Sequence, residues 1–226
     1  MTTGAVPIQG RVTLGVARVP PATNLWACLL AGLPSWRAPL DVNLWRLRNL
    51  PHLLRGFLEV LLARTLRLPT FYGVCHLRKV TSLGKVIDLG VVSFRVVTTA
   101  FVNKVVAGLN AQDTTTFSLF KFHAFGSGAG GPVAGDTALC TEYTTQYATD
   151  NVRPTGSQVN TGNNIYTTAG TFTPDAAVAV TECGVLSQAA TGGGTLMDRF
   201  TFSAVNLNGT GDNLTPTVSI TFAAGG

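Results

Sequence analysis

Leu214-Thr-Pro-Thr-Val-Ser-Ile-Thr-Phe222 alternates between apolar side chains and Thr or Ser. Successive residues of a β-strand point to opposite faces of a sheet, so this period of two predicts a strand with one buried face. Pro216 has no N–H to donate to a neighbouring strand. We therefore expect this strand to lie at a sheet edge, or to be paired on one side only at that position.

The residues upstream predict further strands separated by turns. Runs rich in β-branched and aromatic residues are bounded by clusters of Gly, Asn, Pro and Thr, which favour turns. Several short strands with this spacing predict a mostly β domain over residues 71–226, of β-sandwich or jelly-roll-like type. The expected strands are 71–81, 86–97, 117–125, 164–172, 176–187 and 199–207, with a hairpin turn at 82–84.

One short helix is expected between the second and third strands. Thr98 or Thr99 can cap its first turn, and Gly108 or Asn110 can end it. Apolar residues at helical spacing then predict the stripe that this helix buries. The stripe consists of Phe101, Val102, Val105, Val106 and Leu109.

The N-terminal part of the chain is predicted to differ from the β domain. Residues 1–43 are rich in Pro and are expected to form an irregular arm, whereas residues 44–70 hold a basic amphipathic helix. We place Asn49 as the cap of this helix and Pro51 in its first turn. The expected apolar stripe consists of Leu54, Phe57, Leu58, Leu61 and Leu68.

Charge is divided unevenly along the chain. Residues 1–85 carry eleven Lys and Arg against two acidic residues, whereas residues 86–226 carry five against nine. A basic segment ahead of a mildly acidic body suggests contact with a negative partner, or an arm that only covers the body. The helix is also strongly amphipathic, so nucleic acid is not the expected partner. The candidate partner-binding residues are Trp26, Trp36, Trp45, Arg46, Arg48, Arg55, Arg64 and Arg67.

Three further patterns suggest membrane, cofactor or catalytic roles, and each lacks a required part. Prolines interrupt the uncharged run 19–36, so no membrane span is expected. Gly126-Ser-Gly-Ala-Gly-Gly131 matches the dinucleotide-binding fingerprint, but Pro132 follows where a helix must begin, so no cofactor is expected. His123, Ser127 and Asp136 are the residue types of a hydrolase triad, but the nucleophile elbow is missing.

Two glutamates leave an enzymatic alternative open. Glu142 and Glu182 each follow a Thr, and a pair of carboxylates held at the right separation can cleave glycosidic bonds. Glu182 lies in an apolar strand, and a buried carboxylate needs a partner. Arg199, across the turn at 192–194, is the candidate, so we favour a structural ion pair between Glu182 and Arg199.

The cysteines and histidines are dispersed along the chain. The four Cys and three His form no C-x-x-C pair and no cluster, so no zinc site is expected. Reduced, buried thiols are favoured over disulfides in a domain of this size.

Seven segments, taken in order, carry a resemblance to a known family. They are residues 44–57, 96–101, 122–128, 135–142, 180–187, 192–200 and the last strand, 214–222. In this order they resemble a group of virion structural proteins of tailed bacteriophages. The resemblance begins near Leu44 and runs to the end of the chain, and residues 1–43 lie outside it.

This resemblance implies a structural role without catalytic residues. We expect a capsid decoration (cement) protein that binds the major capsid protein or other virion subunits through its arm and β domain. A homo-oligomer, a trimer or higher, located in the virion, is the expected state. A tail-associated protein, such as a fibre, collar or head–tail connector subunit, is the alternative in the same class. A glycan-cleaving enzyme is the alternative in another class.

Overall fold

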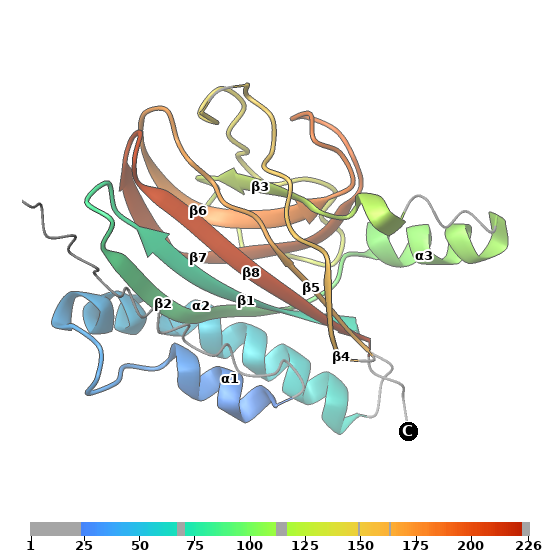
Figure 1. Ribbon diagram of the computed structural model, residues 1–226. Coiled ribbons are helices and arrows are strands. Elements are labelled where there is room, and N and C mark those ends of the chain that lie inside the picture. Colours follow the sequence, from blue (N-terminus) through green and yellow to red (C-terminus); the bar gives the residue numbers. More distant parts are fainter. Residues whose placement is uncertain (1–23, 67–70, 112–116, 149, 163, 223–226) are drawn as a thin grey trace, which may run out of the picture.

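The computed structural model describes residues 24–66, 71–111, 117–148, 150–162 and 164–222. Two antiparallel sheets face each other, which confirms the prediction of a mostly β domain (Figure 1). One sheet has the strand order β2-β1-β8-β5-β4, and the other has the order β3-β6-β7. The strands are β1 (Phe71–Val80), β2 (Val86–Val96), β3 (Phe122–Gly126), β4 (Val159–Gly162), β5 (Ile165–Ala169), β6 (Ala177–Leu186), β7 (Leu196–Asn208) and β8 (Asn213–Phe222).

The alternating segment forms β8, which lies inside the five-stranded sheet between β1 and β5. The edge position predicted for it is therefore wrong. The other expectation, one-sided pairing, holds at Pro216. On the β1 side Pro216 pairs with Leu77, whereas the β5 register ends one residue away, at Thr217. Pro216, which lacks an N–H, thus lies just beyond the last residue of β8 that pairs with β5.

The main hydrophobic core fills the space between the two sheets. Phe125 and Phe172 stack within this core, with ring centroids 4.7 Å apart. Phe200 of β7 and Val218 of β8 are fully buried in the same cluster. The inward-facing residues of both sheets therefore build one continuous core.

Two helices cover the outer face of the five-stranded sheet. These are α1 (Leu25–Gly32) and α2 (Leu40–Thr65), which lie beneath β1 and β2 in Figure 1. Tyr72 and Val74 of β1 point to this side and form a second hydrophobic cluster with the helices. Because β1 contributes to both clusters, the sheet is buried on its two faces along this strand.

The helices correct two predictions for the N-terminal part. Residues 25–32 and 40–43 are helical rather than irregular, and α2 begins nine residues before the predicted cap, Asn49. Pro51 lies inside α2 instead of in its first turn. Pro51 is exposed, so the carbonyl of Leu47, which loses its helical donor, is on the solvent side.

The third helix, α3 (Thr99–Ala111), confirms the predicted cap and corrects the predicted stripe. Thr98 Oγ1 accepts a hydrogen bond from the N–H of Phe101 at 3.2 Å. Phe101 is buried, but Val106 and Leu109 are 61% and 74% exposed. The helix extends away from the sandwich, so only its first turns reach the core (Figure 1).

One predicted strand is shorter than expected. Residues 117–119 form a 3-10 turn, and β3 begins only at Phe122. Phe120, between the two, is buried against Phe101 with ring centroids 5.0 Å apart. The apolar run is therefore explained by burial of a turn as well as by a strand.

Candidate functional site

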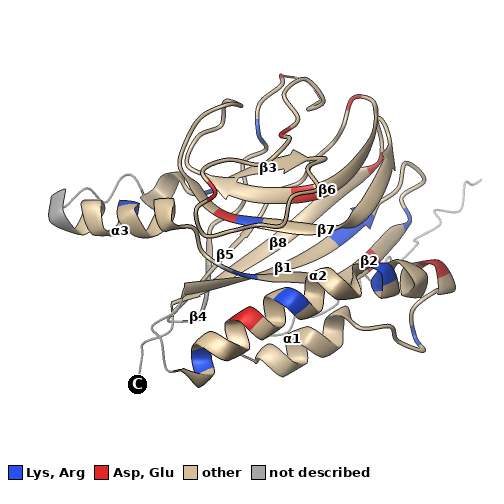
Figure 2. Ribbon diagram, turned by 180° about the vertical axis from the view of Figure 1, so that it is seen from behind, with Lys and Arg blue, Asp and Glu red and all other residues tan. Residues whose placement is uncertain are grey.

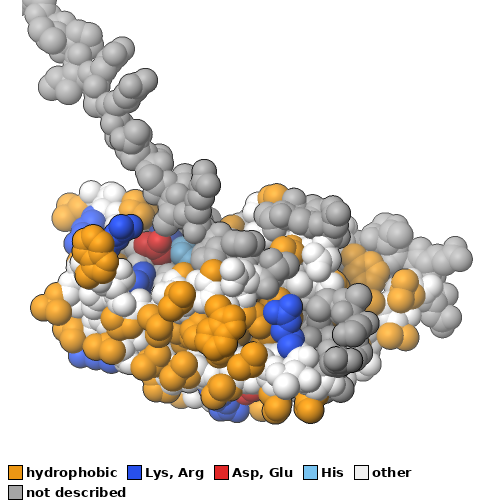
Figure 3. Space-filling view, turned by 90° about the horizontal axis from the view of Figure 1, so that it is seen from below, with side chains coloured by type: hydrophobic (Ala, Val, Ile, Leu, Met, Phe, Trp, Pro, Cys, Tyr) orange, Lys and Arg blue, Asp and Glu red, His pale blue; other side chains and the backbone are white. Residues whose placement is uncertain are grey.

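Among the described residues, the largest set of exposed apolar side chains lies on the outward side of α1 and α2, a surface called here the apolar helix face. Figure 3 shows hydrophobic side chains gathered over this side of the molecule. The exposed fraction ranges from 39% at Leu54 to 75% at Leu40. An apolar area of this kind typically marks contact with another molecule. The face consists of Trp26, Leu30, Leu40, Leu44, Leu47, Leu54, Leu58, Leu62 and Leu66.

Contacts on the opposite side of α2 hold the helix in an orientation in which the apolar helix face points to solvent. The amide of Asn49 donates to Val92 O at 2.8 Å and accepts from the N–H of Ser203 at 2.8 Å. Seven residues on, Gly56 lies so close to β2 that a Cβ would collide with the carbonyl oxygen of Phe94. Both anchors leave no room for α2 to rotate its leucines inward.

The first helix lies alongside α2 and extends the face. Trp26, at the start of α1, packs edge-on against Phe57 with ring centroids 5.0 Å apart. After the end of α1, Leu33 O accepts from Arg46 Nη1 at 3.0 Å. The two helices therefore run in opposite directions as a hairpin. Trp26 is 60% exposed and Leu30 is 66% exposed, so both continue the apolar surface on one side of α2.

The three tryptophans predicted to bind a partner have different surroundings. Trp26 belongs to the apolar helix face, and Trp36, in the segment between the helices, is 87% exposed. The guanidinium of Arg37 lies 4.8 Å from the ring of Trp36. Trp45 instead donates from Nε1 to Ala204 O at 2.9 Å and packs against the sandwich core. Trp45 is therefore placed to hold α2 on the body.

Arg46 also has a structural environment. Its guanidinium donates to three backbone carbonyls, at 3.1 Å to Leu89, 3.0 Å to Leu33 and 3.3 Å to Asp88. Burial lowers the pKa of Arg46, and the nearby Asp88 carboxylate opposes this change. These contacts tie the helical hairpin to β2.

Three of the remaining predicted arginines, Arg48, Arg55 and Arg64, belong to α2, whose charged residues are coloured in Figure 2. Arg48 is exposed, and Arg55 Nε lies 3.2 Å from the carboxylate of Glu59 one turn away. The guanidinium of Arg64 lies over the ring of Tyr72, 5.9 Å from its centroid. Arg67 lies outside the described residues. Only part of the predicted set is therefore available on the exposed side of α2.

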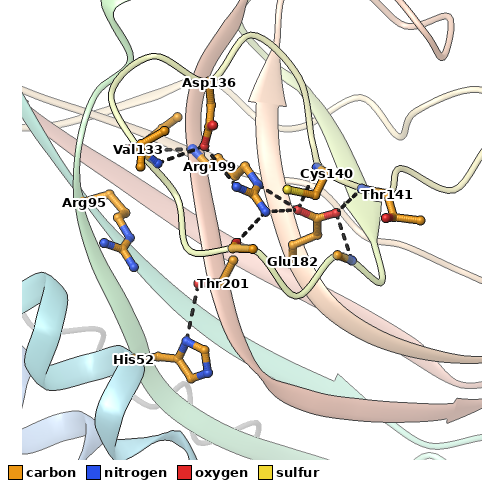
Figure 4. Close-up of polar contacts among 12 residues, drawn as sticks. His52, Arg95, Val133, Asp136, Cys140, Thr141, Glu182, Arg199 and Thr201 are labelled. Carbon is orange, nitrogen blue, oxygen red and sulfur yellow. Dashed lines mark hydrogen bonds and ion pairs between the residues drawn. The ribbon is translucent and has the colours of Figure 1, made fainter.

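Glu182 and Arg199 form the ion pair that the sequence suggested (Figure 4). Arg199 Nη2 lies 2.7 Å from Glu182 Oε2, and both side chains are buried. The carboxylate also accepts from three backbone N–H groups of the loop between β3 and β4. These are Gly128 at 3.0 Å, Cys140 at 3.1 Å and Thr141 at 2.8 Å. Both carboxylate oxygens are thus engaged within the fold.

Arg199 completes this network from the other side. It donates from Nη1 to Asp136 at 3.0 Å and from Nη2 to Gly130 O at 2.8 Å. Burial alone favours the neutral form, but the bonds to Asp136 and Glu182 outweigh it and raise the pKa of Arg199. The network holds residues 128–141 against β6 and β7.

A second ion pair, between Glu142 and Arg153, was not expected from the sequence. Arg153 Nη2 donates to Glu142 Oε2 at 2.8 Å, and Nη1 donates to Gln188 O and Gly193 O at 2.8 Å. Arg153 is buried to 98%. The two glutamates considered for glycoside cleavage are therefore each bound to a different buried arginine.

The other chemical patterns also resolve into structural contacts. His123 is fully buried, its Nε2 lies 2.9 Å from Thr168 Oγ1, and burial lowers its pKa to about 3. Asp136, the acid of the conceivable triad, binds Arg199 instead of His123. The N–H of Gly128, which a dinucleotide phosphate would need, already donates to Glu182.

The cysteines show no disulfide among the described residues, and the His, Cys, Asp and Glu of the same residues form no metal-binding group. Cys75 of β1 and Cys183 of β6 face each other across the core, with their sulfur atoms 3.8 Å apart. Burial raises the pKa of Cys75 well above its usual value. Both thiols thus serve as small core residues.

No protein family, curated protein or solved structure matches this chain. Among the described helices, none is long and apolar enough to cross a membrane. The N-terminal half of the apolar helix face, Leu40 to Leu47, is not predicted from the sequence, because Asn49 has the properties of a helix cap. The spacing of Leu40, Leu44 and Leu47 was the signal that could have revealed it.

Proposed function

We propose that this chain is a structural subunit of a bacteriophage particle, a decoration protein that attaches to the capsid through its apolar helix face. The observation that carries the proposal is the row of exposed leucines on α2, held outward by the anchors at Asn49 and Gly56. Burying such a row against another subunit releases its water and provides the main free energy of attachment.

We propose a bacteriophage particle because the sequence resembles virion proteins of tailed phages. The buried ion pairs of Glu182 and Glu142 support a structural role, because both carboxylates hold loops against the sandwich. The sandwich then acts as a rigid support on which the helices are displayed. Leu25, Cys28 and Leu29 are buried against the body. This part of the N-terminal segment therefore does not serve as a free arm that reaches to neighbouring subunits.

The protruding helix α3 supports a homo-oligomer as part of the same proposal. Val106 and Leu109 are exposed on a helix that extends away from the sandwich. A sister subunit that covers these two side chains would give each protomer a second contact, separate from the capsid contact. Sedimentation of the purified chain and of a Val106→Gln/Leu109→Gln variant measures this: a monomeric wild-type chain contradicts the oligomer.

Purified particles test the proposed function. We expect the chain to be present in high copy number, in the hundreds if it covers the shell, and in far fewer copies if it belongs to the tail. A Leu54→Gln/Leu58→Gln variant should be lost from particles. Leu83→Gln, at a residue that is 94% exposed in the β1–β2 turn, is the matched control and should stay. Absence of the wild-type chain from particles contradicts the proposal.

A further inference from the structure

The exposed leucines of α2 between Leu40 and Leu58 follow, together with Pro51, the spacing of a coiled-coil seam. From Leu40 the row continues through Leu44, Leu47, Pro51, Leu54 and Leu58, with intervals of four, three, four, three and four residues. This is the a and d pattern by which one helix packs along another. Asn49 and Gly56, which contact the sheet, lie on the opposite side of the same helix. The seam therefore faces directly away from the body.

The two flanks of this seam differ in character. On one side α1 runs beside α2 and adds the apolar side chains of Trp26 and Leu30. On the other side Arg48 follows Leu47 and Arg55 follows Leu54, so two arginines repeat at an interval of seven residues. A helix lying on the seam would thus meet apolar surface along one edge and, between Arg48 and Arg55, positive charge along the other.

Glu59 does not cancel this charge. Its carboxylate is shared between Arg55, at 3.2 Å, and the buried Arg95, at 3.0 Å. One carboxylate between two guanidiniums leaves a net positive charge beside the seam. Arg48, one heptad before Arg55, adds a second positive charge at an exposed position.

The same charge argues against a second copy of this chain as the occupant. Antiparallel pairing of two α2 seams centred between Pro51 and His52 brings Arg48 of each copy beside Arg55 of the other, and like charges at these flanking positions are unfavourable. Residues 1–23 are equally mismatched, because they contain Arg11 and Arg18 and no acidic residue.

We infer that the apolar helix face binds an amphipathic helix of another virion subunit, with an apolar heptad row and with Asp or Glu repeated every seven residues along one flank. The inference rests on the proposed function and names the partner's chemistry. Contact of the acidic flank with Arg48 and Arg55 fixes the register, while the leucines bury the apolar row. A lipid surface fits less well, because the exposed carboxylate of Asp41 lies at the start of the leucine row.

Two designed peptides test the inference on the full-length protein. Both have about four heptads with Leu at the a and d positions, and carry either Glu or Lys at the flanking positions. Titration with labelled peptide should show binding of the Glu peptide at least tenfold tighter than binding of the Lys peptide. Arg48→Glu/Arg55→Glu should reverse this preference. Lys104→Glu/Lys121→Glu, a double reversal on α3 and before β3, should leave it unchanged.

Several outcomes overturn the inference. The first is equal or absent binding of the two peptides. The second is binding that persists in Leu54→Gln/Leu58→Gln. A wild-type dimer that this variant disperses would identify a second copy as the occupant, and leucine-dependent binding to anionic phospholipid vesicles would identify a membrane. Detection of the wild-type chain in purified particles is a separate measurement that tests the proposed function. A chain that is present in particles but does not prefer the Glu peptide would contradict the partner chemistry alone.

Discussion

Glu182 and Arg199 lie diagonally across the β6–β7 pair, where Glu182 is opposite Thr201 and Arg199 is opposite Gly184. Their charged groups meet at 2.7 Å in the buried interior. Three backbone N–H groups of the 127–141 loop and the carboxylate of Asp136 complete the cluster. A loop that has little regular structure is thereby fixed by one charged pair of the sheet.

Removal of the arginine should be costly for stability. Arg199→Met leaves the Glu182 carboxylate buried without its cation, which should lower the free energy of unfolding by about 3 kcal/mol. Chemical denaturation measures this, and Glu182→Gln/Arg199→Met should lose less than the sum of the two single changes. Arg48→Met, at an exposed position, is the control and should change stability by less than about 0.5 kcal/mol. Equal effects of Arg199→Met and Arg48→Met would contradict the structural role of the pair.

The buried histidine should make the protein sensitive to acid. Burial lowers the pKa of His123 to about 3, whereas an unfolded histidine titrates near 6.5. The unfolded chain therefore binds the extra proton first, and stability should fall as pH decreases from 6.5 towards 3, by up to about 1.4 kcal/mol per pH unit. His123→Gln retains a side chain that can bond to Thr168 and does not titrate. Unfolding at several pH values should show a smaller slope for this variant, and identical slopes would disprove the assignment.

Any side chain at Gly56 should destabilise the protein, because α2 lies close to β2 at this residue. Gly56→Ala places a methyl group against the carbonyl of Phe94, so α2 must move away from the sheet, at a cost of more than about 2 kcal/mol. Gly135→Ala is the matched control, because a Cβ there meets no atom within 4 Å. Thermal unfolding compares the two variants. A Gly56→Ala protein as stable as Gly135→Ala would show that the helix is not held as described.

The cysteines should differ in reactivity. Cys140 is exposed, whereas Cys75 and Cys183 are buried between the sheets and burial raises the pKa of Cys28 to about 11. An alkylating reagent at neutral pH should label Cys140 first in the native protein, and the other three only after unfolding. Peptide mass spectrometry identifies the labelled sites. Native labelling of Cys75 at the rate of Cys140 would be inconsistent with the closed sandwich.

The strands could be predicted because their signals are local. Alternation in 214–222, and the turn at 82–84 between two β-branched runs, fix residues that neighbour one another in the chain. The central position of β8 could not be derived in this way, since it depends on β1 and β5 meeting it from distant parts of the sequence. The predicted start of α2 is wrong because Asn49 has a side chain typical of a helix cap, whereas the helix begins at Leu40. In the fold the amide of Asn49 instead satisfies backbone groups of β2 and β7.

Of the two buried ion pairs, one could also be predicted from local sequence signals and the other could not. Glu182 and Arg199 lie on adjacent strands that follow one another in the chain and are connected by residues 187–195, so their contact could be inferred from an apolar strand that needs a counter-ion. Glu142 and Arg153 come from irregular segments around residues 142 and 153, and no periodicity predicts how these segments meet. The exposure of Leu40, Leu44 and Leu47 likewise depended on which side of α2 the sheet would occupy.

The order of elements along the chain has a consequence for biosynthesis. The helices α1 and α2 precede β1 and β2, whose outer face they cover, so the ribosome releases the cover before the surface that it protects. A nascent β1–β2 hairpin can therefore pair with finished helices at once, while β8, its other neighbour, is still more than a hundred residues from completion. Such early shielding reduces the time during which bare strands can aggregate with other emerging chains.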